Sequence, residues 1–316
     1  MTADQLLTAL FNAGIVISVG ATVLSLGMSF TVGQLMSPLR RVWLVIAMVV
    51  LNALVIPAAA WGIAKASPMN NQYVPGLVLA TLGAGSAASL KAAQLAKRAD
   101  LPLAVSLAVV LQLVNIVAVP LWAGKVVTGA SISAWDIVKS LLALVLLPLV
   151  VGLFVRARYA DHATSWQPEL VKAANLALVI AMATGIAANW STIVSLFGSW
   201  VSATAIAIVI LAGVLGLLLG GKSTEVRTTT GLVSSFRFGS LGLGIIGTQL
   251  NGNPTYLGPA IVFALIDFIL PIALAVEIGH RSDGPPASEH PATPAAAPPK
   301  AADADDARRG RASDSG

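Results

Sequence analysis

A basic residue closes an apolar segment that small residues interrupt, and the segment reads Leu79-Ala80-Thr81-Leu82-Gly83-Ala84-Gly85-Ser86-Ala87-Ala88-Ser89-Leu90-Lys91. A second segment repeats this layout, and it reads Gly231-Leu232-Val233-Ser234-Ser235-Phe236-Arg237-Phe238-Gly239-Ser240. A charge at bilayer depth costs a few kcal/mol or more, so it usually faces a cavity or a partner and marks function. We therefore expect Lys91 and Arg237 to line a solute site near the middle of a membrane.

The composition places the chain in a membrane. Of its 316 residues, 56% are hydrophobic and 10% are charged, whereas a soluble domain carries roughly 25% charged residues. The formal net charge is +5, but the basic residues lie in short loops between apolar runs, which argues against a nucleic-acid partner. There is no cysteine, so a disulfide framework, a thiolate metal site and a cysteine nucleophile are excluded.

A spanning helix needs about 20 mostly apolar residues, and nine stretches of the chain meet this requirement. Together they predict an all-α integral membrane domain over residues 1–281. From residue 282 to 316 the chain is rich in Pro, Ala, Asp, Arg and Ser, which predicts a disordered tail. The predicted spans are 9–33, 42–64, 74–97, 101–124, 134–156, 170–190, 198–220, 228–250 and 256–279.

The loop charges predict the orientation. Ten basic residues fall in the loops on one side and three in the loops on the other. By the positive-inside rule, this bias predicts a multi-pass protein of the plasma (inner) membrane with the ten-residue side in the cytoplasm. The N-terminus is then outside, and the C-terminal tail is cytoplasmic. The ten are Arg40, Arg41, Lys97, Arg98, Arg156, Arg158, Lys172, Lys222, Arg227 and Arg281, and the three are Lys65, Lys125 and Lys139.

Interrupted helices at matching places in two halves are the sequence pointer to an inverted-repeat transporter. At each break, at 83–89 and 234–240, backbone groups leave the helical ladder and become available to an ion or a substrate. The hydroxyls of Ser89, Ser234 and Ser235 lie at these breaks. Small residues also allow close helix packing, but the adjacent charge favours a binding site.

Other polar residues lie within predicted spans. The carboxylate of Asp267 needs a cation or a proton, so we expect either pairing with Arg237 or Lys91, or a role in proton relay. Gln112 and Asn115 are three residues apart and share a helix face. They would line the cavity or form hydrogen bonds between helices. Asn52 is expected to hold helices together.

The sequence shows no enzyme constellation. The three histidines fall in predicted cytoplasmic loops or the tail, and there is no HExxH motif, no phosphate-binding GxxxxGK[ST] motif and no buried Ser-His-Asp arrangement. No cofactor is expected. The expected partners are a small organic anion and the lipid bilayer, and the oligomeric state is left open.

Four stretches, in this order and spacing, resemble the bile acid:sodium symporter family. They lie at residues 24–30, 56–61, 83–89 and 228–241, and the similarity extends over roughly residues 10–280. The resemblance implies two inverted repeats, a core domain with two crossing discontinuous helices, a panel domain and transport by alternating access. Nine spans would mean that the first helix of the family is absent.

The resemblance also implies where sodium would bind, and the chain departs from that pattern. Ser89 matches a family serine, but Leu90 stands where an asparagine is expected. At the second break Thr229, Val233 and Ser234 replace a glutamate, a glutamine and an asparagine. A sodium site at Ser89, Ser106, Thr229 and Ser234 is therefore the alternative interpretation.

Our leading hypothesis is that Lys91 and Arg237 replace the bound cations at the crossover and attract an organic anion, with Asp267 balancing one of them. Two cations and one carboxylate would leave one positive charge for the substrate. The sequence then describes a secondary active transporter of a small organic anion. The competing interpretations are a sodium-coupled symporter of the usual family type and a non-transporting membrane receptor.

Overall fold

The computed structural model describes residues 3–29, 41–127 and 134–281, and within them the chain is helical, without a strand. The predicted tail, 282–316, lies outside the described residues. The helices, with η for π or 3₁₀ segments, are α1 (Ala3–Ser29), α3 (Val42–Val50), η2 (Leu51–Val55), α4 (Ile56–Ala66), η3 (Asn71–Tyr73), α5 (Val74–Thr81), α6 (Ala87–Leu95), α7 (Leu101–Val126), α8 (Ala134–Leu141), η4 (Leu142–Leu146), α9 (Leu147–Arg158), α10 (Ala160–Ala188), α11 (Trp190–Leu196), α12 (Trp200–Leu219), α13 (Thr224–Ser235), α14 (Gly239–Gln249) and α15 (Pro254–His280).

Seven helical stretches in the described ranges are long and apolar enough to cross a membrane. The segments α3, η2 and α4 form one of them, and α8, η4 and α9 form another. The other two predicted spans each consist of two shorter helices, α5 with α6 and α13 with α14. The all-helical membrane fold is confirmed, whereas the count of nine spans and the inverted repeat stay predictions.

Helix starts carry the residues that local geometry favours. The side chains of Asp100, Ser199, Ser223 and Asn253 each accept a hydrogen bond from a backbone N–H in the first turn that follows. This contact satisfies a donor that has no partner within the helix. Proline follows in the first turn of α7 and α15, where its missing N–H is harmless.

One boundary prediction is wrong by ten residues. We expected a span to start at residue 170, but α10 starts at Ala160. The added part contains Asp161, His162 and Glu169, which are exposed. A hydropathy pattern detects only the part of a helix that lies in lipid, and this helix continues beyond that part.

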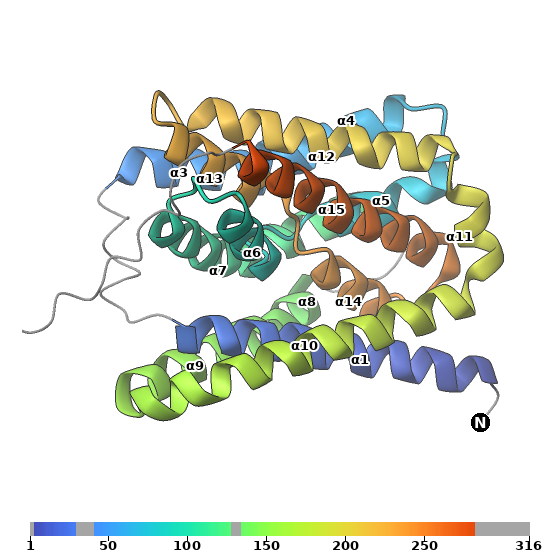
Figure 1. The fold of residues 1–316 in the computed structure, drawn as a ribbon. Coiled ribbons are helices and arrows are strands. Elements are labelled where there is room, and N and C mark those ends of the chain that lie inside the picture. The colour runs from blue at the N-terminus through green and yellow to red at the C-terminus, as the bar shows by residue number, and fades with distance from the viewer. Residues whose placement is uncertain (1–2, 30–40, 128–133, 282–316) are drawn as a thin grey trace, which may run out of the picture. The chain divides into compact units, whose positions relative to one another are not determined.

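The described helices form two layers (Figure 1). In one layer α1 packs along α9 and α10. The contact is close, since a Cβ atom on Gly27 would lie 3.0 Å from the Cα atom of Gly152. The other layer holds the two pairs of short helices together with α3, α4, α7, α12 and α15. Contacts of α1 with α6 and α14 join the layers beside those short helices.

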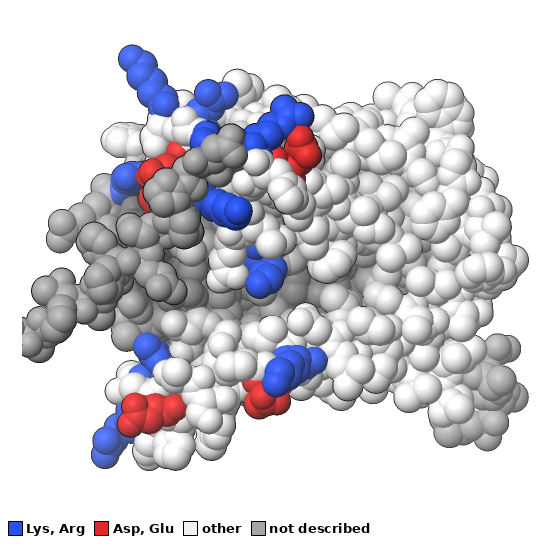
Figure 2. All heavy atoms as spheres, viewed as in Figure 1, with Lys and Arg blue, Asp and Glu red and all other residues white. Residues whose placement is uncertain are grey.

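Basic side chains gather at one end of the face shown in Figure 2. The start of α1 lies at the opposite end in the same view (Figure 1). This arrangement matches the bias counted in the loops. The direction of insertion itself, with the N-terminus outside, stays a prediction.

Candidate functional site

The two interrupted helices meet at their breaks. The chain leaves helical geometry between Thr81 and Ala87 in the first and between Ser235 and Gly239 in the second. Ala84 and Arg237 pair as an isolated antiparallel bridge, and the N–H of Phe238 donates to the carbonyl of Gly83 at 3.0 Å. The sequence predicts breaks at 83–89 and 234–240, and the structure has them at 82–86 and 236–238, so both are found and both are shorter than expected.

Local sequence explains the first break. Gly85 has a φ of +76°, which lies in the left-handed region that favours glycine. The hydroxyl of Ser86 then accepts a hydrogen bond from the N–H of Ala88 at 3.2 Å and starts α6. Gly83 has no side chain between it and the other helix, where a Cβ atom would lie 2.8 Å from the carbonyl oxygen of Phe238. The glycines thus allow both the turn and the crossing.

Side chains from neighbouring helices hold the backbone of each break. On α7, Asn115 accepts from the N–H of Ala84 at 3.3 Å and donates to its carbonyl at 2.8 Å. On α15, the Asp267 carboxylate accepts from the N–H of Arg237, at 2.9 and 3.1 Å. Gln112 donates to the carbonyl of Gly85 at 3.0 Å. Both amides thus form hydrogen bonds from α7 to the backbone of the first break, and a part in lining a cavity stays a prediction for them.

The side chain of Arg237 is buried, with 2% of the residue exposed. Its Nε donates to the carbonyl of Thr81 at 2.7 Å, its Nη1 to the Oδ1 of Asn52 at 2.7 Å, and its Nη2 to the carbonyl of Asn52 at 3.1 Å. Thr81 is the last residue of α5, so its carbonyl lies at the negative end of that helix. Three oxygen atoms therefore surround one guanidinium group.

Asn52 is a site residue that the sequence analysis treated only as packing. Its main-chain carbonyl is available because Pro57, five residues later, has no N–H to donate to it across the π segment η2. The neighbouring carbonyl of Ala53 accepts a hydrogen bond from the indole Nε1 of Trp122 at 2.8 Å. The side-chain amide of Asn52 donates to the hydroxyl of Ser234 at 3.2 Å. In the sequence, the proline five residues after Asn52 indicates that the carbonyl of Asn52 is free to bind another group.

Lys91 does not hold the crossover together, and that part of our hypothesis is wrong. It lies within α6 rather than at the break, and its side chain is exposed. The residue that pairs with Arg237 is Ala84. Lys91 is on the opposite face of α6 from Ser89, Ala92 and Ala93, which are buried, and a part in binding an anion stays a prediction for it.

The charges of the expected tally are not all buried. Within the described crossover the buried charges are one cation, Arg237, and one carboxylate, Asp267. The two share a backbone hydrogen bond, and no ion pair joins the guanidinium to the carboxylate among the described residues. The second cation of the expected tally, Lys91, is exposed.

The hydroxyls proposed for sodium donate to carbonyls of their own helices or turns. These bonds are Ser89 to Ser86 at 2.6 Å, Ser106 to Pro102 at 3.0 Å and Thr229 to Glu225 at 2.8 Å. The hydroxyl of Ser235, expected at the break but not as a sodium ligand, donates to the carbonyl of Leu232 at 3.0 Å. Ser234 instead accepts from Asn52. Hard cations take oxygen ligands, but the three oxygens around the Arg237 side chain, which come from Thr81 and Asn52, already accept hydrogen bonds from its guanidinium. A sodium ion at this position would have to displace the guanidinium of Arg237.

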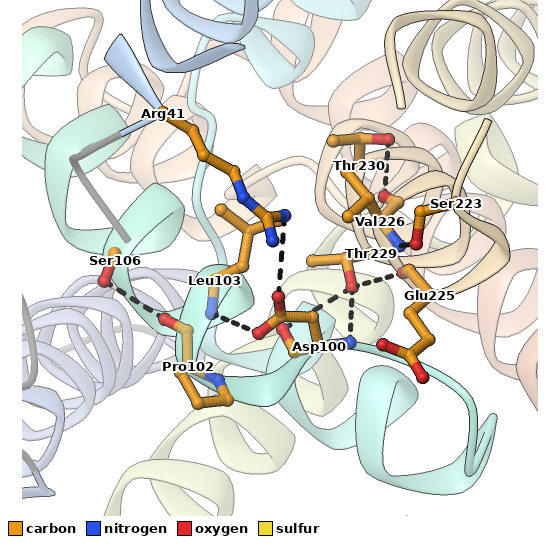
Figure 3. A network of polar contacts seen from close by, with 10 residues as sticks. All are labelled: Arg41, Asp100, Pro102, Leu103, Ser106, Ser223, Glu225, Val226, Thr229 and Thr230. Atoms are coloured by element: carbon orange, nitrogen blue, oxygen red, sulfur yellow. Dashed lines mark hydrogen bonds and ion pairs between the residues drawn. The ribbon is translucent and has the colours of Figure 1, made fainter. Parts of the chain in front are cut away.

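Thr229 belongs to a different network, near the start of α7 and α13 (Figure 3). Its hydroxyl accepts from the N–H of Asp100 at 2.8 Å, and the Asp100 carboxylate accepts from the N–H of Leu103 at 3.0 Å. Arg41 lies 3.8 Å from the same carboxylate. This network joins the two helices at one end of the molecule and gives Thr229 a structural part.

The chain matches a known family over much of its length. The model of the sodium bile acid symporter family matches residues 16–220, which is more than half of the chain and includes the first break. The second break, with Arg237, lies beyond the matched residues. No curated protein compared with the chain matches it.

Proposed function

The chain belongs to the sodium bile acid symporter family, and we propose that it is a multi-pass membrane carrier that moves a small organic anion by alternating access. One observation carries this proposal further than family membership. The two broken helices are joined at Ala84 and Arg237, where backbone groups leave the helical ladder inside the membrane domain. Such irregular backbone is tolerated at membrane depth only where protein or a cavity surrounds it, and in carriers it forms the binding site.

The charge available at this place favours an anion. Lys91 is exposed on α6 and makes no hydrogen bond or ion pair among the described residues. It is the middle residue of that helix, about one turn from the N-terminal end at Ala87, and it is this end that carries the partial positive charge of the helix dipole. The N-cap residue of α14, Phe238, offers no side-chain bond to the first N–H groups of that helix. An organic carboxylate would meet one full and two partial positive charges.

The layer boundary supports alternating access. The helix α1 of the first layer contacts α6 and α14, which are the second halves of the two broken helices. A movement of this layer against the other would therefore open and close access beside the breaks. Under this proposal, Arg237 takes the place of a bound cation at the second break, and Lys91 attracts the substrate.

Sodium-coupled symport is the second candidate, because the family is described as one of sodium symporters. It would need the hydroxyls of Ser89, Ser106, Thr229 and Ser234 to turn from their present partners. The first break carries no cation among its own residues, from Leu82 to Ser86, so this candidate rests on the first break rather than the second.

The test starts with purified protein in detergent. Thermal unfolding is followed in the presence of acetate, pyruvate, lactate, succinate and taurocholate, and we expect at least one anion to raise the midpoint. Uptake of ¹⁴C-labelled pyruvate and ³H-labelled taurocholate into proteoliposomes follows. Stabilisation without uptake of either probe would favour a receptor, and uptake of a neutral analogue at the same rate would contradict an anion site.

A further inference from the structure

The guanidinium of Arg237 has the surroundings of a bound cation. It faces three oxygen atoms, from Thr81 and Asn52, at 2.7–3.1 Å. Two of these are main-chain carbonyls, one at the end of α5 and the other released by Pro57. Groups of this kind are suited to a metal cation as well as to a guanidinium. The position is therefore built for positive charge, and a side chain of the protein fills it.

This cation is also held on its backbone side. The N–H of Arg237 donates to the Asp267 carboxylate, so a negative group lies at the main chain while the charged end reaches Asn52 and Thr81. One residue thus links α15, α3–η2–α4 and α5. In an ion-coupled carrier, binding of the ion would have to create such links in each cycle. Here they are part of the folded chain.

Resting on the function proposed above, we infer that Arg237 is a tethered cation that makes the carrier independent of sodium. Its crossover is assembled in every state, and reorientation between the two sides needs no ion. A ligand shifts a conformational equilibrium only through a difference in affinity for the two states, and a position that is always filled offers sodium no such difference. Transport is then driven by the gradient of the organic anion itself, either as net flux or as exchange of one anion for another.

The first experiment measures sodium directly and needs no substrate. Equilibrium binding of ²²Na⁺ and the midpoint of thermal unfolding in sodium or choline chloride are determined for the whole protein. For the natural chain we expect no saturable ²²Na⁺ binding and no shift of the midpoint. Saturable binding, or a midpoint that rises with sodium, would overturn the inference.

Variants identify the position. Arg237→Lys keeps the positive charge, so it can be tested even if the Arg237→Ala protein does not fold. We expect the unfolding midpoint of Arg237→Lys to be the same in sodium and in choline chloride. For Arg237→Ala we expect a lowered midpoint that methylguanidinium raises again. Lys91→Ala is the matched control, since it removes an exposed cation, and methylguanidinium should not shift its midpoint. Failure of methylguanidinium to act on Arg237→Ala more than on the control would show that the three oxygens do not form a cation position.

The second experiment measures flux. Proteoliposomes loaded with unlabelled pyruvate or taurocholate receive the labelled form of the same anion outside. We expect transient accumulation by exchange, equal in sodium, potassium and choline, and net uptake that stops at equal concentrations. Accumulation above equilibrium that requires an inward sodium gradient would overturn the inference while leaving the carrier function intact. Absence of flux for both anions in every medium would instead count against the carrier function, and ²²Na⁺ binding would still decide the inference.

Discussion

The two breaks of the crossover share one backbone arrangement and differ in charge. At the first, the neutral amide of Asn115 holds Ala84, and none of the residues from Leu82 to Ser86 is charged. At the second, the carboxylate of Asp267 holds Arg237, whose guanidinium is buried. The spacing is alike, with 31 residues between the first pair and 30 between the second. A neutral clamp is therefore enough to shape a break, and the charges of the second have another purpose.

Removal of the buried cation should have the largest effect. Arg237→Ala leaves the carbonyls of Thr81 and Asn52 without a donor and the Asp267 carboxylate without a nearby positive charge. Each buried polar group that loses its partner costs about 1–3 kcal/mol, and this substitution removes three hydrogen bonds of the guanidinium at once. We expect a strongly lowered midpoint in thermal unfolding and loss of anion uptake. Arg227→Ala removes an exposed arginine of the same helix region and should leave both unchanged.

The second largest loss of stability is expected when a charge is placed at the first break, which is neutral. Asn115→Asp puts a carboxylate beside the carbonyl of Ala84 and removes the donor to it, without a cation near it in the described crossover. An unsatisfied buried group costs about 1–3 kcal/mol, and more when it is charged. Thermal unfolding checks the expectation, with the isosteric Asn115→Leu as a comparison. If Asn115→Asp is as stable as the natural protein, the first break does not require a neutral clamp.

The converse change should be milder. Asp267→Asn keeps an oxygen acceptor for the N–H of Arg237 but removes the negative charge. A hydrogen bond to a charged group is worth about 1.5–3 kcal/mol against about 1 kcal/mol for a neutral one, so we expect a loss of about 1–2 kcal/mol. Measuring Asn115→Asp and Asp267→Asn side by side tests whether a buried charge is tolerated at one break only. If both substitutions lower the free energy of unfolding equally, the two breaks do not differ in their need for charge.

The backbone of the first break gives a further comparison. Gly85→Ala puts a Cβ atom on a residue with φ of +76°, which costs about 1–2 kcal/mol, and places it against the carbonyl of Ala108. The second break has no residue with positive φ between Ser235 and Gly239. Ala substitution of Phe238 should therefore lose side-chain packing without this backbone strain. Denaturant unfolding of both variants separates the two effects.

The smallest effect on stability belongs to Lys91. Because its side chain is exposed, we expect Lys91→Ala to change the free energy of unfolding by less than about 0.5 kcal/mol. If it attracts the substrate, the KM for uptake should rise about tenfold, which corresponds to about 1.4 kcal/mol. Lys91→Arg should keep the natural KM. A large loss of stability with unchanged KM would reverse the roles assigned to the two cations.

Sequence patterns predicted the helices and both breaks, because apolar length and small residues act locally. They also singled out Arg237 and Asp267, since a charge inside an apolar run stands out. They placed Lys91 at the crossover, whereas its side chain is exposed on α6. The position of a residue along one helix does not show whether its side chain faces the core or the outside. They missed the contact between Asn52 and Arg237, since it joins residues 185 positions apart and depends on how three helices pack.

A cation that is part of the chain has an electrical consequence. It is not delivered with the substrate, so in net flux, unlike in exchange, each transported monoanion moves its own negative charge without compensation. A potential of 100 mV is worth about 2.3 kcal/mol per charge, or roughly a fiftyfold concentration ratio at equilibrium. In a cell with a negative interior, Arg237 would make release of the anion the favoured direction of net flux. Current recorded from proteoliposomes during pyruvate transport would show that charge movement.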